Sequence, residues 1–158
     1  MRLTLLLPIA ALALASCAAG PTAQTHAVTR VVATTSFGMC VGYCTTRLEI
    51  SEGQAVLIRE ARAGRGGGGP VQDTQRFTAQ LSALEWQEIQ RLAASADFDA
   101  LPDVVGCPDC ADGGAESLTV EGPTGAESVS FEFGATLAQA RPLLERVRAL
   151  RDRLMPRE

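Results

Sequence analysis

Apolar and polar residues alternate in several parts of the chain. Thr46, Leu48 and Ile50 alternate with Arg47 and Glu49, and Val56 and Ile58 continue the two-residue repeat. The Ser-Glu-Gly-Gln segment 51–54 between them has turn composition. A two-residue repeat places alternate side chains on one face of a strand, so this region predicts a β-hairpin with one apolar face. Residues 28–34 are rich in β-branched side chains, which favours a strand before that hairpin.

The same alternation recurs in three later segments. Residues 77–81 predict a further strand, and residues 118–120 and 129–133 predict a second hairpin. The turn of that hairpin is the Gly-Pro-Thr-Gly segment 122–125.

Two other segments have helical spacing. Ser82 and Glu85 stand three residues apart, the spacing of a capping box, in which each side chain bonds the other residue's backbone N–H at a helix start. The apolar side of this helix is predicted to consist of Leu84, Ile89, Leu92, Ala93 and Ala96, with Trp86 either packed or exposed.

A second helix is predicted to begin between Thr136 and Arg141, with Pro142 in its first turn, where proline is tolerated. Its buried stripe is predicted to be Leu143, Leu144, Val147, Leu150 and Leu154, and its solvated side mostly Arg141, Arg146, Arg148, Arg151 and Arg153.

This order of elements predicts an α+β fold. We expect a single domain over residues 28–154, in which two helices cover one face of a small antiparallel sheet built from hairpins. Residues 155–158 are expected to form a tail.

The amino terminus has the features of a secretory signal peptide. Arg2 is followed by a stretch from residue 3 to residue 14 that is apolar apart from Thr4. This stretch is shorter than the roughly 20 residues that a membrane-spanning helix needs. We therefore assign residues 1–16 to a cleaved signal.

Leu14-Ala15-Ser16-Cys17 resembles the lipobox of bacterial lipoproteins. The resemblance implies cleavage before Cys17 and acylation of that cysteine, so that membrane lipid is the first expected partner. The alternative is a cysteine that happens to lie near an ordinary cleavage site. Residues 17–27 are small and polar, as in a flexible tether. Because Ala18 stands where aspartate would favour the inner membrane, we expect the outer membrane, facing the periplasm of a Gram-negative host.

Charge and composition exclude several functions. Removing residues 1–16 removes only Arg2, which leaves 13 basic against 18 acidic residues and a formal charge of −5. This balance argues against a nucleic-acid partner. All basic residues are arginine, so a Walker A loop, a Schiff base and a lysine base are excluded, and the one histidine, His26, lies in the expected tether. Catalysis through histidine in the domain is therefore not expected.

Five glycines lie within residues 62–70. A phosphate-binding loop would need a following Lys-Ser/Thr pair, which this segment lacks. We interpret it as a hairpin tip.

The remaining cysteines are Cys40, Cys44, Cys107 and Cys110. An even number of cysteines in an exported chain indicates disulfides, and four allow three connectivities. Pairing of near neighbours in the sequence is favoured, while crossed pairing would constrain a longer unfolded loop and stabilise more.

Three other uses of these loops remain open. Cys107-Pro108-Asp109-Cys110 has the spacing of a thiol–disulfide redox site, although Asp109 and Asp112 would disfavour a thiolate. A four-thiolate zinc site would usually have tighter spacing and a reducing compartment. The third possibility is a calcium site, whose ligands would be Asp103, Asp109, Asp112 and Glu116. We expect these residues to form a solvated acidic loop instead.

The segment from Ser36 to Cys44, the hairpin after it and residues 77–101 together resemble domain-of-unknown-function family 6438. The likeness covers roughly residues 30–154, although no proline follows Cys44, as that family's pattern has. It implies the fold and an envelope setting, with no activity to transfer. It also supports local disulfides, because that family has the first cysteine pair without the second.

We therefore expect a non-enzymatic, membrane-anchored envelope lipoprotein that acts as a binding or structural module, with no cofactor and no metal. The alternative is a thiol–disulfide redox protein that uses Cys107 and Cys110.

Overall fold

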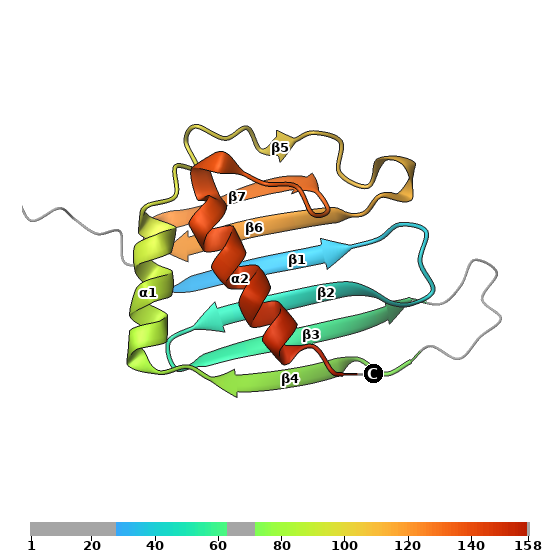
Figure 1. Cartoon of the computed structure of the whole chain (residues 1–158), viewed down its shortest axis with the longest axis horizontal. Helices are drawn as coiled ribbons and strands as arrows, with labels where there is room; N and C mark the ends of the chain where they lie inside the picture. The colour runs from blue at the N-terminus through green and yellow to red at the C-terminus, as the bar shows by residue number, and fades with distance from the viewer. Residues whose placement is uncertain (1–27, 63–71, 158) are drawn as a thin grey trace, which may run out of the picture.

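A computed structural model describes residues 28–62 and 72–157 of the chain. Figure 1 shows the arrangement of its strands and helices. In chain order these are β1 Arg30–Ser36, β2 Gly42–Ser51, β3 Gln54–Arg62, β4 Gln75–Gln80, α1 Ala83–Ala94, β5 Val104–Val105, β6 Ala115–Gly122, β7 Gly125–Glu132 and α2 Arg141–Leu154. Short 3₁₀ helices at Cys110–Asp112 and Ala138–Ala140 precede β6 and α2.

All the strands belong to one sheet of order β4-β3-β2-β1-β6-β7-β5. Neighbouring strands are antiparallel except β5, which is parallel to β7. Along its whole length, β1 pairs with β2 on one side and with β6 on the other. The predicted α+β class is confirmed, but the sheet is larger than the small one expected. The difference arises because β1 joins the two hairpins into one sheet, and β5 adds an edge strand within a predicted loop.

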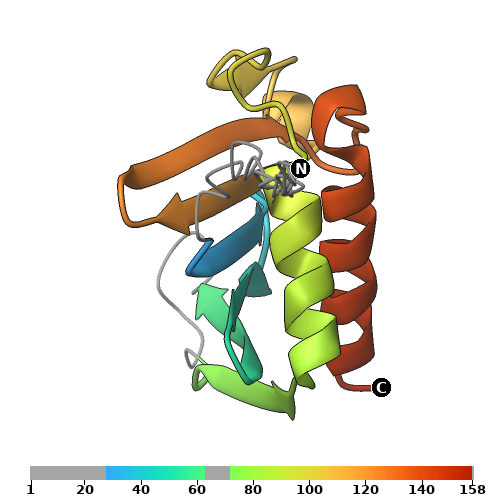
Figure 2. The same cartoon turned by 90° about the vertical axis from the view of Figure 1, so that its left-hand side faces the viewer.

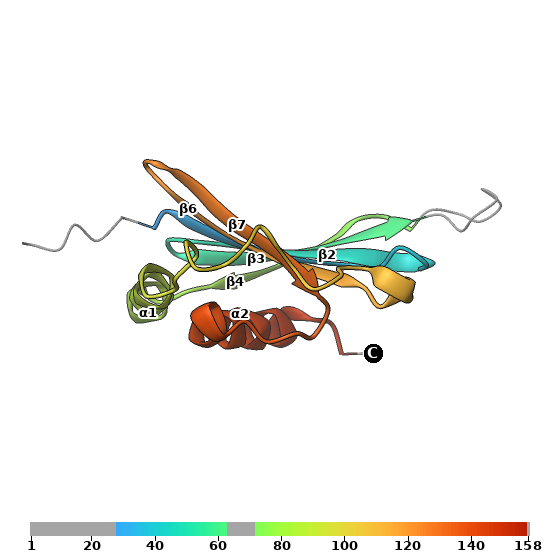
Figure 3. The ribbon, with the colours of Figure 1, turned by 90° about the horizontal axis from the view of Figure 1, so that it is seen from above.

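Both helices cover the same face of the sheet, as Figures 2 and 3 show. Leu48, Ile50 and Leu118 are fully buried on that face. In β3 the core residues are Ala55 and Leu57, which pair with Ile50 and Leu48. The expectation that Val56 and Ile58 continue the apolar face is wrong, because they pair with Glu49 and Arg47 and so lie on the opposite face. The opposite face carries paired polar groups, such as the Arg30–Glu49 ion pair at 2.8 Å and the Thr119–Ser128 hydroxyl pair at 2.8 Å. An antiparallel sheet with one covered face has this pattern.

The capping box of α1 is present. The Ser82 N–H donates to Glu85 Oε2 at 3.0 Å, and the Glu85 N–H donates to Ser82 Oγ at 3.2 Å. The prediction that Leu84 lies on the apolar side is wrong, because Leu84 is 77% exposed and Trp86 is buried instead. These two residues are about 200° apart around the helix axis, so only one of them can face the sheet.

The second predicted helix is confirmed. It begins at Arg141, has Pro142 in its first turn, and buries Leu143, Leu144, Val147 and Leu150. Among the described residues, no helix is long and apolar enough to cross a membrane.

The two ends of the sheet differ. We call the end where residue 28 enters the tether end; it holds the tight turns after β2 and β6 and the start of α1 (Figure 1). The opposite end, which we call the loop end, holds residues 37–41 and 106–114 and the segment after β7. The signal, Cys17, the tether and residues 63–71 of the glycine-rich segment lie outside the described residues.

Candidate functional site

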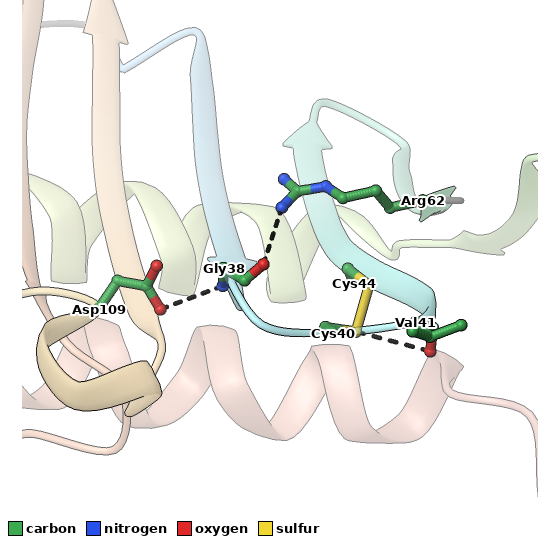
Figure 4. Close-up of a disulfide and its surroundings, with 6 residues drawn as sticks. All are labelled: Gly38, Cys40, Val41, Cys44, Arg62 and Asp109. Carbon is green, nitrogen blue, oxygen red and sulfur yellow. Dashed lines mark hydrogen bonds between the residues drawn. A yellow bond between two sulfur atoms is a disulfide. The ribbon is translucent and has the colours of Figure 1, made fainter. Parts of the chain in front are cut away.

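Both cysteine pairs lie at the loop end. Cys40 is bonded to Cys44, and Cys107 to Cys110, with Cα–Cα distances of 5.5 Å in each pair. Figure 4 shows the first disulfide on one side of Gly38 and Asp109, which comes from the second loop, on the other. The connectivity is the local one that the sequence analysis favoured.

Direct contacts join the two loops. Asp109 Oδ1 accepts a hydrogen bond from the Gly38 N–H at 3.1 Å, and Arg62 Nη1 donates to the Gly38 carbonyl at 3.2 Å (Figure 4). The rings of Phe37 and Phe133 meet edge to face with centroids 4.9 Å apart. Residues about 70 to 100 positions apart in the sequence thereby hold one surface together.

Two glycines make this close approach possible. A Cβ on Gly114 would overlap the Phe37 ring, and Gly114 has a φ of +83°, which side-chain-bearing residues seldom adopt. A Cβ on Gly38 would overlap the Asp109 carboxylate. A substitution at Gly114 would therefore separate the loops, whereas one at Gly38 would displace the Asp109 carboxylate and its hydrogen bond to the Gly38 N–H.

The first loop is continuous with the sheet. Cys44 is 2% exposed and lies in β2, at an irregularity in the pairing with β3 between Tyr43 and Thr45. The left-handed backbone there falls on Gly42, with a φ of +89°, so it needs no strained side-chain-bearing residue.

The second loop is held against ordinary backbone preferences. Asp109, Ala111 and Asp112 have φ values of 58°, 51° and 60°. Left-handed backbone costs roughly 1–2 kcal/mol for a residue with a Cβ, and less for aspartate. The loop is closed by hydrogen bonds from the Asp109 N–H to the Gly114 carbonyl at 3.0 Å and from the Cys107 N–H to Glu132 Oε1 at 2.9 Å. Its conformation therefore depends on its disulfide and its contacts.

Apolar side chains are exposed on this end of the molecule. Met39 is 59% exposed, Val41 is 79% exposed and Phe133 is 45% exposed. We call these three residues the apolar patch. Several exposed apolar residues at one end of a domain are typical of binding sites.

A row of buried polar residues lies just inside the loop end. Thr46, Thr35 and Glu116 are neighbours across β2, β1 and β6 on the helix-covered face. Glu116 is 4% exposed, and its carboxylate accepts hydrogen bonds from Arg148 and, at 2.9 Å, from Arg151. A cavity of about 10 Å³, which is room for about one water molecule, lies beside this group.

The structure corrects two predictions at this row. Glu116 is not part of a solvated acidic loop or a calcium site, because it is a residue of β6 whose carboxylate faces α2 and its arginines. Arg148 and Arg151 are not on the solvated side, because both turn back over the sheet to reach Glu116. The available signal was that Glu116 continues the alternation of Leu118 and Val120.

The structure also bears on the zinc site, the metal sites and the redox site that the sequence left open. The four cysteines form two separate disulfides, so they do not converge on one zinc ion. Within residues 28–62 and 72–157, no three His, Cys, Asp or Glu side chains gather in a way that could hold a metal ion. Cys107 and Cys110 lie in a loop lined by Asp109, Asp112 and Glu132, and nearby carboxylates disfavour a thiolate.

Neither a scan against protein-family models nor a search of the curated proteins finds a match to this chain. The lipobox and the likeness to family 6438 therefore stay predictions from the sequence.

Proposed function

We propose that this protein is a lipid-anchored binding module of the cell envelope, without catalytic activity, and that the loop end is its recognition surface. The observation that carries the proposal is the meeting of two disulfide loops at one end of the sheet, where they expose the apolar patch. A surface that is held rigid before a partner arrives loses little conformational entropy on binding.

The place where the chain enters the sheet supports a recognition surface that faces away from the membrane. Residue 28 precedes the start of β1 at the tether end, whereas the patch residues follow the ends of β1 and β7 at the opposite end of the sheet. The 11 residues 17–27 would span at most about 40 Å when extended. A lipid on Cys17 would thus hold the tether end toward the membrane and leave the loop end free to meet a partner.

The anchor is tested by removing the sulfur that would carry the lipid. Cys17→Ser should leave an uncleaved precursor that no longer enters the detergent phase, because only the thiol of Cys17 can take the acyl group. Cys107→Ser is the matched control, since it removes another cysteine and should partition like the wild type. Unchanged partitioning and unchanged mature size of Cys17→Ser would refute the anchor.

The second candidate function is thiol–disulfide exchange at Cys107-Pro108-Asp109-Cys110. It is favoured by the exposure of both cysteines and by the left-handed residues between and after them, because strained, exposed disulfides are the more easily reduced. In such a reaction two thiols of a partner protein would be oxidised to a disulfide while Cys107–Cys110 became two thiols. The neighbouring carboxylates argue against it. A potential well above about −300 mV, with rapid alkylation of one sulfur at neutral pH, would favour this candidate over a structural disulfide.

A further inference from the structure

We infer that the loop end binds a protein segment in which apolar side chains stand next to lysine or arginine. This inference rests on the proposed function and names the class of partner that the same surface takes.

The centre of the surface requires an apolar contact. Met39 and Val41 flank Cys40 in the loop of residues 37–41, which the Cys40–Cys44 disulfide ties to β2, and Phe133 packs on Phe37 of the same loop. The Asp109–Gly38 hydrogen bond fixes the same loop from its other side. Burying these exposed side chains against a partner would remove apolar area from water, which supplies the main free energy of most protein associations.

One side of the patch is acidic. Asp109 and Asp112 lie in the second loop, Glu132 ends β7, and Asp73 precedes β4. Asp109 and Glu132 accept hydrogen bonds from the backbone N–H groups of Gly38 and Cys107, which leave their negative charges in place. On the side of Asp73, Arg59, Arg62 and Arg76 supply opposing positive charge. The net negative charge therefore belongs to the side formed by the second loop and Glu132.

This negative charge favours one kind of partner for the patch over two others. A bilayer surface rich in anionic lipid would be repelled by the carboxylates, and a second copy of the chain would bring the same carboxylates together. A protein segment with basic residues beside its apolar anchors would satisfy both the patch and its rim. Complementary charge would also speed encounter with that segment and weaken its binding as salt rises.

The test is a selection of random peptides on phage. The bait is the mature protein in neutral detergent micelles, and the counter-selection uses a Met39→Ser/Val41→Ser variant, whose exposed positions leave the fold intact. We expect the enriched peptides to carry apolar residues next to Lys or Arg. Synthetic versions should bind about tenfold more weakly at high salt than at low salt.

Two point variants sharpen the result. Asp112→Asn keeps a residue type that tolerates the left-handed backbone and removes one charge, so it should weaken these peptides about two- to fivefold. Leu84→Ser alters a side chain that is 77% exposed at the tether end and should leave the affinity unchanged.

Other outcomes overturn the inference. Patch-dependent peptides without basic residues, or without salt sensitivity, would refute the partner class while leaving the recognition surface in place. Patch-dependent dimers, or patch-dependent binding of the Cys17→Ser chain to phosphatidylglycerol vesicles, would assign the surface to a second copy or to the membrane. Failure to enrich any patch-dependent peptide would refute both this inference and the proposed recognition surface.

Discussion

The two ends of the sheet are built in different ways. At the tether end, short turns close the hairpins, and the capping box of Ser82 and Glu85 starts α1. At the loop end, two disulfides, the Asp109–Gly38 hydrogen bond and the Phe37–Phe133 contact hold irregular backbone in place. At the tether end the turns and the helix start are closed by residues near in sequence, beside distant pairs such as Arg30–Glu121. At the loop end the irregular segments themselves are held by contacts between distant segments.

The regular turns lie at the tether end, and the proposed recognition surface lies at the irregular loop end. Local interactions suffice where the chain only has to turn and return. An irregular surface with exposed apolar residues needs additional constraints, because nothing in its own backbone preferences maintains it. We therefore expect the loop end to be more sensitive than the tether end to the loss of single tertiary contacts.

The largest difference in unfolding free energy between the two ends is expected when the buried carboxylate of Glu116, which borders the loop end, is removed. Glu116→Ala would leave Arg148 and Arg151 without their shared partner in a site where their side chains are only 23% and 20% exposed. Removing one member of such a buried ion pair costs about 3 kcal/mol of unfolding free energy, measured by urea denaturation.

Glu121→Ala is the matched control at the tether end. Its pair with Arg30 is longer, at 3.7 Å, and the Glu121 side chain is 36% exposed, so the loss should stay below about 1 kcal/mol. Equal losses for Glu116→Ala and Glu121→Ala would contradict the distinction between the two ends.

A smaller difference is expected between the two disulfides. Each closes a short loop, and cross-links of this length stabilise by about 2 kcal/mol through the unfolded state. Replacing Cys40 and Cys44 with alanine should therefore cost about 2 kcal/mol. Replacing Cys107 and Cys110 should cost less, about 1 kcal/mol, because Asp109, Ala111 and Asp112 can then leave the left-handed region. The reverse order in thermal unfolding would show that the second loop is not strained.

The smallest effect concerns acid stability at the tether end. The backbone N–H of Ser82, together with Arg153 and the Ser82 hydroxyl, lowers the pKa of Glu85 from 4.5 to about 2. Because the folded pKa lies below the unfolded one, the stabilising contribution is complete above about pH 4.5 and is lost as the pH falls through 2. Glu85→Gln should flatten the decline in unfolding free energy across this window. Parallel pH profiles for wild type and Glu85→Gln would contradict the assignment.

What could be predicted from the sequence follows the same division. The hairpins, both helices and the capping box of Ser82 depend on local spacing, and they were predicted. The pairing of β1 with β6 was not, because it joins residues about 80 to 90 positions apart, and alternation does not specify which strands become neighbours.

The candidate site was predicted only in part. The cysteines and their local pairing could be proposed from spacing, but their meeting through Asp109 and Gly38 is a consequence of the sheet order. The role of Glu116 was missed because an acidic residue after a glycine-rich loop looks solvated until its strand register is known. Leu84 was misassigned and Trp86 was left open, because both are apolar and the helix can turn only one of them inward.

The proposed orientation, with a tethered end and a recognising end, is tested most directly by site-specific photo-cross-linking in native envelopes. Val41 at the loop end is 79% exposed and Leu84 at the tether end is 77% exposed, so a photoreactive residue at either position is equally accessible to solvent. We expect irradiation to give a discrete cross-linked adduct from position 41 and none from position 84. Adducts from position 84 alone, or equal adducts from both positions, would contradict the assignment of recognition to the loop end.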